Sequence, residues 1–269
     1  MPRIWKHIIN ITFSALLICV LTGAYFLGVA SRKPIRCKGL AITVTDSTMN
    51  KFITPREIRQ YLDEELEGGY IGVQMDSIDL TRIEEILDSK SAIFKSEAFT
   101  TKDSILNIVI TQKKPVVRFQ KGNQGFYAVE DGSIFPLQDT YTSHVMVVDG
   151  NIPMNFEDGD SMWLKNIITL VKHIENSRTW QGKIVQITVQ NDGNLILVPR
   201  EGQERFLFGQ PSELEDKFEK MGLYYKGIRK ENGEDAYRTI DLRFKGIYPE
   251  IIIRRTDIGV SDHVFCSIN

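Results

Sequence analysis

Residue types that commonly carry catalysis are few in this chain and do not form a known catalytic pattern. The histidines are scattered singly, as His7, His144, His173 and His263. No glycine-rich phosphate loop, G-x-S-x-G turn or H-E-x-x-H pair is present. Carboxylates that are distant in sequence can converge in a fold, so a membrane-anchored envelope hydrolase is kept as an alternative hypothesis.

Candidate metal ligands and disulfide partners are equally sparse. Asp158-Gly159-Asp160 lacks the spaced ligands and the closing Glu of an EF-hand loop, so a turn is expected there. Cys19, Cys37 and Cys266 form no C-x-x-C pattern, which argues against a zinc or redox site. A Cys37–Cys266 disulfide outside the cytoplasm stays an alternative. We expect no catalytic residue, no metal and no cofactor.

The N-terminal region contains a long apolar segment. Residues 8–30 include no Asp, Glu, Lys, Arg or Pro, and as a helix they would extend about 34 Å, enough to cross a bilayer core. An uncleaved transmembrane anchor is predicted, although Gly28-Val29-Ala30 loosely fits a signal-peptide cleavage site. Residues 1–7 are predicted to be a cytoplasmic tail, but the basic residues on the two flanks do not decide the orientation.

The rest of the chain has the composition of a folded protein. The whole sequence of 269 residues is 42% hydrophobic and 25% charged. Residues 31–269 hold 31 basic and 35 acidic residues, once Arg3 and Lys6 are subtracted from the 33 basic residues of the chain. This balance argues against nucleic-acid binding. Residues 31–38 are predicted to be a basic linker beside the lipid headgroups.

A first domain is predicted over residues 39–115. A short strand at 40–44 precedes Thr54-Pro55-Arg56-Glu57, which is a capping box with Pro at the first helical position. A second helix is expected at 79–88, and strands are expected at 92–99 and 105–111. This order predicts a three-stranded sheet with two helices on one face.

A second domain, rich in strands, is predicted over residues 116–255. In it, strands at 184–189 and 195–198 flank Asn191-Asp192-Gly193-Asn194, which predicts a hairpin turn. One inserted helix is expected at 161–176, and another from the capping box Ser212-Glu213-Leu214-Glu215 to Gly222. The last strong strand is predicted at 237–244, with Ile240, Leu242 and Phe244 inward and Asp241 and Arg243 in water. Residues 256–269 are expected to be a frayed tail. The predicted fold class is α+β.

This order of features, together with three short motifs, resembles the FtsQ/DivIB family of bacterial cell-division proteins. The motifs are Phe52-Ile53-Thr54-Pro55, the run Lys114–Arg118 at the domain junction, and the run Ile240–Gly246. The resemblance implies a single-pass inner-membrane protein with a cytoplasmic N-terminus. It also implies a periplasmic POTRA domain (βααββ) followed by the β domain of the family, a location at the division septum, and no enzymatic activity.

The resemblance also implies partners. Proteins of this family link early and late division proteins and hold the FtsB/FtsL pair by strand addition near the last strands, and thereby act indirectly on septal peptidoglycan synthase. Carried onto this sequence, the site would comprise Asp241, Arg243, Phe244, Ile247 and Tyr248. Leu242 and Phe244 could instead belong to the core. Pro249 interrupts the expected edge, and Ile251–Ile253 could restore it.

Two other function classes are weighed against this one. An anchored hydrolase would need a pocket with close, mutually perturbing acids. An outer-envelope transport module is also conceivable because POTRA units accompany barrel proteins, but the sequence contains one such unit and no barrel-sized run of membrane strands. No nucleic acid and no small-molecule substrate is expected as a partner.

Overall fold

The computed structural model describes residues 3–30, 34–45, 51–66, 69–139, 141–154, 160–232, 237–243, 251–254 and 263–266. The chain divides into two compact units. The first unit comprises Met1–Thr43, Pro55–Leu87 and Ser96–Val109, and the second comprises Val44–Thr54, Asp88–Lys95 and Ile110–Asn269.

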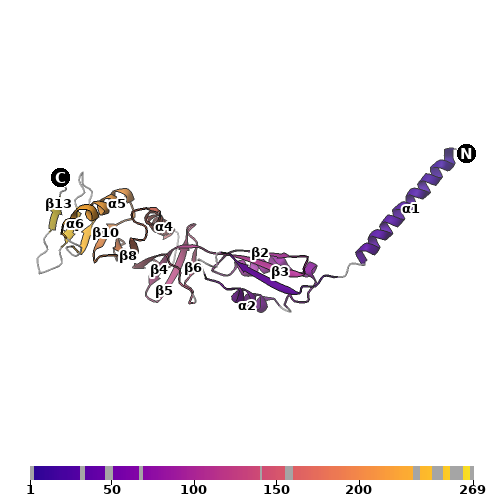
Figure 1. Cartoon of the computed structure of the whole chain (residues 1–269), viewed down its shortest axis with the longest axis horizontal. Helices are drawn as coiled ribbons and strands as arrows, with labels where there is room; N and C mark the ends of the chain where they lie inside the picture. Colours follow the sequence, from indigo (N-terminus) through magenta and orange to yellow (C-terminus); the bar gives the residue numbers. More distant parts are fainter. Residues whose placement is uncertain are drawn as a thin grey trace. The chain divides into compact units, whose positions relative to one another are not determined.

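The chain begins with a long helix, α1 (Arg3–Ala30) (Figure 1). Its large apolar side chains with a described position are exposed, from Trp5 through Ile11 to Leu27. Over the described parts of the chain, no helix combines the length and the apolar character that a membrane crossing requires.

A three-stranded sheet and two helices follow α1. The strands β1 (Gly39–Val44), β2 (Ile93–Thr100) and β3 (Ile105–Gln112) have the spatial order β1-β3-β2. Between β1 and β2 lie α2 (Pro55–Glu65), a short 3-10 helix η1 (Met75–Ser77) and α3 (Leu80–Asp88). The predicted order of strand, two helices and two strands is therefore confirmed.

Each of these two helices buries one stripe of apolar side chains. Ile58 and Leu62 of α2 and Ile83 and Leu87 of α3 are buried, at the spacing of one helical face. Asp79 precedes α3, and its Oδ1 accepts the Arg82 backbone N–H at 2.9 Å, which satisfies one of the free amides at the helix start.

The second unit is built on a ten-stranded mixed sheet with the order β13-β12-β11-β10-β9-β8-β7-β4-β5-β6. The pairs β4·β7, β7·β8 and β10·β11 are parallel. The strands are β4 (Pro115–Lys121), β5 (Gln124–Val129), β6 (Ile134–Pro136), β7 (Met146–Gly150), β8 (Ile184–Val189), β9 (Leu195–Pro199), β10 (Arg205–Gly209), β11 (Thr239–Asp241), β12 (Ile251–Arg254) and β13 (His263–Cys266).

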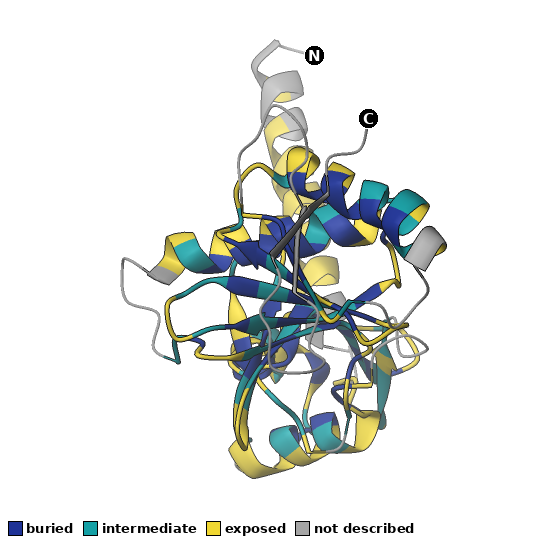
Figure 2. Ribbon diagram, turned by 90° about the vertical axis from the view of Figure 1, so that its left-hand side faces the viewer, coloured by how far each residue is buried: buried dark blue, intermediate teal, exposed yellow. Residues whose placement is uncertain are grey.

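Two helices, α4 (Asp160–Asn176) and α5 (Leu214–Leu223), share one core with this sheet (Figure 2). They touch each other through the stacked rings of His173 and Phe218, whose centroids are 4.9 Å apart. Alternate residues of the strands are buried in this core, as in β9, where Leu195 and Leu197 are fully buried and Ile196 is not. The strands therefore show the alternation of a sheet that buries one face more deeply than the other.

The end of α5 corrects the prediction. Gly222 does not stop the helix, because a π-helical turn η2 (Tyr224–Ile228) and α6 (Arg229–Asn232) continue it. The continuation buries Tyr224 and Ile228, and this burial outweighs the cost of about 1 kcal/mol for a glycine in a helix. The predicted capping box is also wrong, since Glu213 occupies the N-cap position with φ of 55° and makes no side-chain cap bond.

The C-terminal strands also differ from the prediction. The strand predicted at 237–244 is the shorter β11, and Asp241, expected in water, is buried. Strand β10 was missed, although Phe206 and Phe208 alternate in it and are fully buried. The segment expected to be a frayed tail contains β13, which pairs antiparallel with β12. These differences have one cause: pairing across the sheet, which local sequence does not encode.

A small aromatic cluster within the second unit surrounds Phe52. Its ring makes edge contacts with Tyr127, Phe135 and Tyr141, with centroids 5.3, 5.3 and 4.9 Å away. Ala92 is buried in the same cluster. The backbone N–H of Ile53 donates to Gln112 Oε1 at 3.0 Å, which fixes the chain beside Phe52. The short segment that carries Phe52 thus contributes to a small buried cluster of the second unit, separate from its main core.

Candidate functional site

The residues predicted to contact a partner begin on β11, which lies inside the sheet. β11 pairs in parallel with β10 and antiparallel with β12. The backbone N–H of Leu242 continues the ladder by donating to Leu207 O at 3.0 Å. Among the described strands, β13 and β6 are the outermost ones. A strand added from outside would therefore meet β13 or β6 and not β11.

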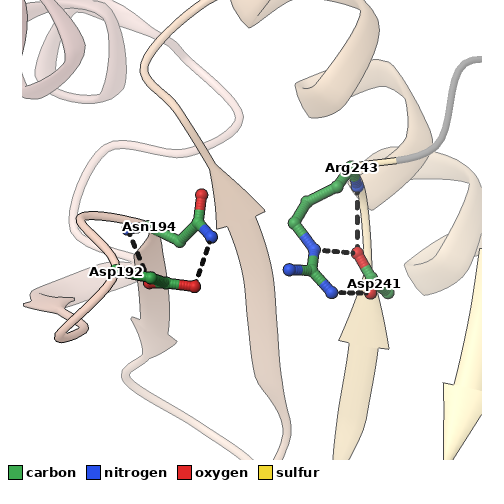
Figure 3. A network of polar contacts seen from close by, with 4 residues as sticks. All are labelled: Asp192, Asn194, Asp241 and Arg243. Atoms are coloured by element: carbon green, nitrogen blue, oxygen red, sulfur yellow. Dashed lines mark hydrogen bonds and ion pairs between the residues drawn. The ribbon is translucent and has the colours of Figure 1, made fainter.

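Asp241 and Arg243 form a tight pair at the end of β11 (Figure 3). Arg243 Nε donates to Asp241 Oδ1 at 2.9 Å, and Arg243 Nη2 donates to Asp241 Oδ2 at 2.6 Å. The backbone N–H of Arg243 also donates to Oδ1, at 3.1 Å. The guanidinium thus binds both carboxylate oxygens, which is the strong two-pronged geometry of an Arg–carboxylate pair.

Within this pair the Asp241 side chain is buried, whereas the Arg243 side chain is partly exposed to solvent. The Asp241 side chain is 8% exposed and the Arg243 side chain is 40% exposed. The hydrogen bonds to Asp241 are the main cause that raises the pKa of Arg243, and the charges of Asp241 and Asp192 act in the same direction. The exposed end of Arg243 is therefore the part of this pair that can meet another molecule.

A cavity of about 480 Å³ lies beside Arg243. Gly209 at the end of β10 forms part of its wall with φ of 72°, and a Cβ at this position would lie only 2.9 Å from Arg243 Cγ. The close approach of backbone and side chain therefore requires glycine here. Lys217 lines the same cavity, and its Nζ donates to Gln210 O at 2.6 Å.

The β8–β9 turn carries the nearby acid Asp192 (Figure 3). Asp192 Oδ1 accepts the backbone N–H of Asn194 at 3.0 Å, and Oδ2 accepts Asn194 Nδ2 at 2.7 Å. The bond from the Asn194 backbone is the main cause that lowers the pKa of Asp192. The turn therefore presents a stable negative charge that faces the guanidinium.

Of the five predicted partner residues, Asp241 and Arg243 are brought together. Phe244, Ile247 and Tyr248 lie outside the described residues, as does Pro249. The sequence prediction missed Gly209 and the role of Asp192, although the Asp192-Gly193 turn itself was recognised. Neither residue could have been connected with Arg243 without the strand order, because β9, β10 and β11 meet only in the sheet.

The polar groups around Arg243 are suited to binding another molecule. Both oxygens of Asp241 are occupied by Arg243, so neither is placed to act as a base. Over the residues with described positions, no group of three or more His, Cys, Asp or Glu side chains could hold a metal ion. Cys37 is a buried free thiol whose Sγ lies 3.4 Å from Gly39 O.

Comparisons with known families match two adjacent parts of the chain. The model of a POTRA-like domain matches residues 35–111. The model described as FtsQ/DivIB, C-terminal related, matches residues 114–247, which include Asp241 and Arg243. A search of curated proteins finds no match. The two matches occur in the order expected from the resemblance, and the fold combines a POTRA-like domain with a β-rich domain. The chain belongs to the FtsQ/DivIB family.

Proposed function

We propose that this protein is a non-enzymatic scaffold of the bacterial division machinery that binds an FtsB/FtsL-type pair of division proteins. The observation that carries the proposal is the succession, in one chain, of a POTRA-like domain and an FtsQ/DivIB-related domain. Through these partners the protein links early and late division proteins and helps to control the septal peptidoglycan synthase.

The proposed mode of binding is strand addition near the C-terminal end of the large sheet. The sheet ends there in three successive short strands, β11, β12 and β13, and the last two are added antiparallel. An outermost strand leaves one side of its backbone without a strand neighbour, and a partner strand can pair with it. Arg243, Phe244, Ile247 and Tyr248 are proposed to contribute side-chain contacts beside the backbone ladder.

We further propose that residues 8–30 anchor the protein in the inner membrane and that the two domains lie in the periplasm at the septum. The support is the uncharged sequence of this segment and the exposure of its apolar side chains from Ile11 to Leu27. The domain boundaries 39–115 and 116–255 belong to the same proposal. Recovery of the full chain in the soluble fraction after cell lysis would contradict the anchor.

The strand-addition model is tested by proline substitutions in the two outermost strands. Successive residues direct their N–H groups to opposite sides of a strand, so Val264→Pro and Phe265→Pro together sample both sides of β13. One of them should abolish co-purification of the FtsB-like protein with the full chain. Ile134→Pro, in the outermost strand at the other end of the sheet, is the matched control and should leave co-purification unchanged.

The side-chain part of the site is tested by Phe244→Glu, which should abolish capture of the same partner while circular dichroism stays unchanged. Unchanged capture would contradict the assignment of these residues. The division role has its own test, because depletion of the protein should produce undivided, filamentous cells. Normal division after depletion would contradict the function itself.

A further inference from the structure

A second cavity of the large sheet lies where β8 begins and β9 ends. Its volume is about 360 Å³, and its lining includes three basic residues from three parts of the chain: Lys183, Arg200 and Arg229. The acidic residue of the lining is Glu201, and the aromatic one is Tyr225. The residues that line this cavity are distinct from those around Arg243.

Two of these basic residues, Lys183 and Arg200, occupy opposite backbone positions at the end of the β8–β9 ladder. Ile184 is the partner of Pro199, and the next step of the ladder is a bond of 2.7 Å from Arg200 N to Lys183 O. Like charges placed opposite each other on neighbouring strands are unfavourable. The arrangement therefore costs stability unless something of opposite charge lies between the two side chains.

An irregularity in the ladder creates this arrangement. Gln186 pairs with Val198, and this register, continued without change, would set Lys183 opposite Glu201 as an ordinary ion pair. A register shift between Ile184 and Gln186 sets Lys183 opposite Arg200 instead. Bulges of this kind commonly redirect side chains beside binding sites.

Neither side chain is neutralised by an acid within the described part of the chain. Arg200 Nε donates to Gly182 O at 2.7 Å, and Lys183 Nζ lies 5.9 Å from the centroid of the Trp180 ring. These contacts hold both side chains in position but leave their positive charges uncompensated. An oxyanion accepts hydrogen bonds from such groups with good geometry.

The third basic residue, Arg229, forms an ion pair with a buried acid. Arg229 Nε lies 3.5 Å from Glu204 Oε1, and the Glu204 side chain is fully buried. The Arg229 guanidinium carbon lies 5.1 Å from the centroid of the Tyr225 ring. Gly202, with φ of 90°, leaves room for the Glu204 carboxylate, which lies where a Cβ would be. The pair therefore joins a lining residue of the cavity to a buried acid.

We propose that this cavity binds an oxyanion, a carboxylate or a phosphate group, between Lys183 and Arg200. The register shift sets the two cations opposite each other, and both of them line the cavity. The inference stands apart from the proposed role in cell division, because it uses none of the residues assigned to partner binding.

The test is a titration of the full chain with sodium phosphate and, separately, with sodium acetate, with sodium chloride keeping the ionic strength constant. Tryptophan emission is a suitable readout because the buried Trp180 contacts both Lys183 and Tyr225. The thermal midpoint is the second readout, since a ligand that binds the folded state raises it. A saturable response is expected, and the stronger of the two anions identifies the source of the oxyanion.

Charge variants make the assignment specific. Arg200→Gln should weaken anion binding about tenfold. Lys165→Gln removes one positive charge from the exposed face of α4 and should leave binding unchanged. The proposal is overturned if neither anion gives a saturable response, or if the double variant Lys183→Gln/Arg200→Gln responds as the unmodified chain does.

Discussion

Arg243 and Arg200 lie near opposite ends of the same strand, β9, and differ in how their charge is satisfied. Gly209, against which Arg243 packs, is paired with Leu195 at the start of β9, whereas Arg200 directly follows Pro199 at its end. Arg243 is bound through both oxygens of a buried carboxylate. Arg200 has a carbonyl contact and faces a lysine. Arg243 therefore stabilises the fold through a buried acidic partner, whereas Arg200 has no acidic partner among the described residues.

The largest effect is expected at the buried pair of Glu204 and Arg229, a residue that lines the cavity between Lys183 and Arg200. Glu204→Gln removes the charge of a fully buried acid that lies 3.5 Å from Arg229, which is 14% exposed. Breaking a buried pair in this way should lower the free energy of unfolding by about 3 kcal/mol. Denaturant unfolding of the variant measures the loss. A loss below about 0.5 kcal/mol would show that Arg229 is compensated from elsewhere.

The next largest effect tests the fold-stabilising arginine. Arg243→Gln leaves the buried Asp241 carboxylate with one backbone donor instead of three donors. Since the Arg243 side chain is 40% exposed, solvent screening reduces the effect, and a loss of about 2 kcal/mol is expected. Thermal and denaturant unfolding of this variant should agree. If Arg243→Gln were as stable as the unmodified chain, Arg243 would not stabilise the fold.

Alkaline pH tests Tyr224 and Tyr225, the two tyrosines whose pKa values are affected by the charge of Glu204. Burial raises the pKa of Tyr224 to about 12, and it also raises the pKa of Tyr225. The negative charge of Glu204 is the second cause in both cases. Between the unfolded value of 10 and the folded value, the unfolded chain has lost the proton and the folded chain keeps it, so stability falls as pH rises.

At pH 11 this loss should amount to roughly 1 kcal/mol for Tyr224. Tyr224→Phe should show a shallower decline of stability between pH 10 and pH 12 than the unmodified chain. Stability below pH 9 should depend on pH equally in both proteins. A decline of equal slope in the variant would place the titrating group elsewhere.

The smallest effect is expected when Arg200, instead of Arg243, is replaced by Gln. Arg200→Gln removes one hydrogen bond to a carbonyl but also removes the repulsion from Lys183. These two contributions nearly cancel, so the free energy of unfolding should change by less than about 0.5 kcal/mol. Added salt should stabilise the unmodified chain slightly more than the variant, because it screens the repulsion. A loss of stability as large as that for Arg243→Gln would show that Arg200 stabilises the fold as much as Arg243 does.

Local sequence patterns predicted much of this fold but not its pairings. Asn191-Asp192-Gly193-Asn194 identified the β8–β9 turn, because Asp and Gly favour such turns. The bulge farther along the same hairpin was not predictable, and simple counting would have paired Lys183 with Glu201. Gly222 was misread as a helix end because the burial of Tyr224, two residues later, depends on the tertiary core.

The candidate site was predictable to a similar extent. Asp241 and Arg243 are two residues apart, so their side chains were expected on one face of a strand. Their burial was not predicted, because it depends on the position of β11 between β10 and β12. The nearby Asp192 belongs to a turn 49 positions earlier in the sequence. Only the order of strands in the sheet brings these three residues together.

The aromatic cluster around Phe52 has a consequence for dissecting this protein into fragments. Residue 52 falls within the part of the sequence matched by the POTRA-like family, yet its ring belongs to a small buried cluster of the second unit. A fragment cut at residue 114 would lack Phe52 and Ala92 and would expose Tyr127 and Phe135 to water. Such a truncated protein should aggregate or melt early, and longer fragments that retain the N-terminal segment are better suited to biochemical work.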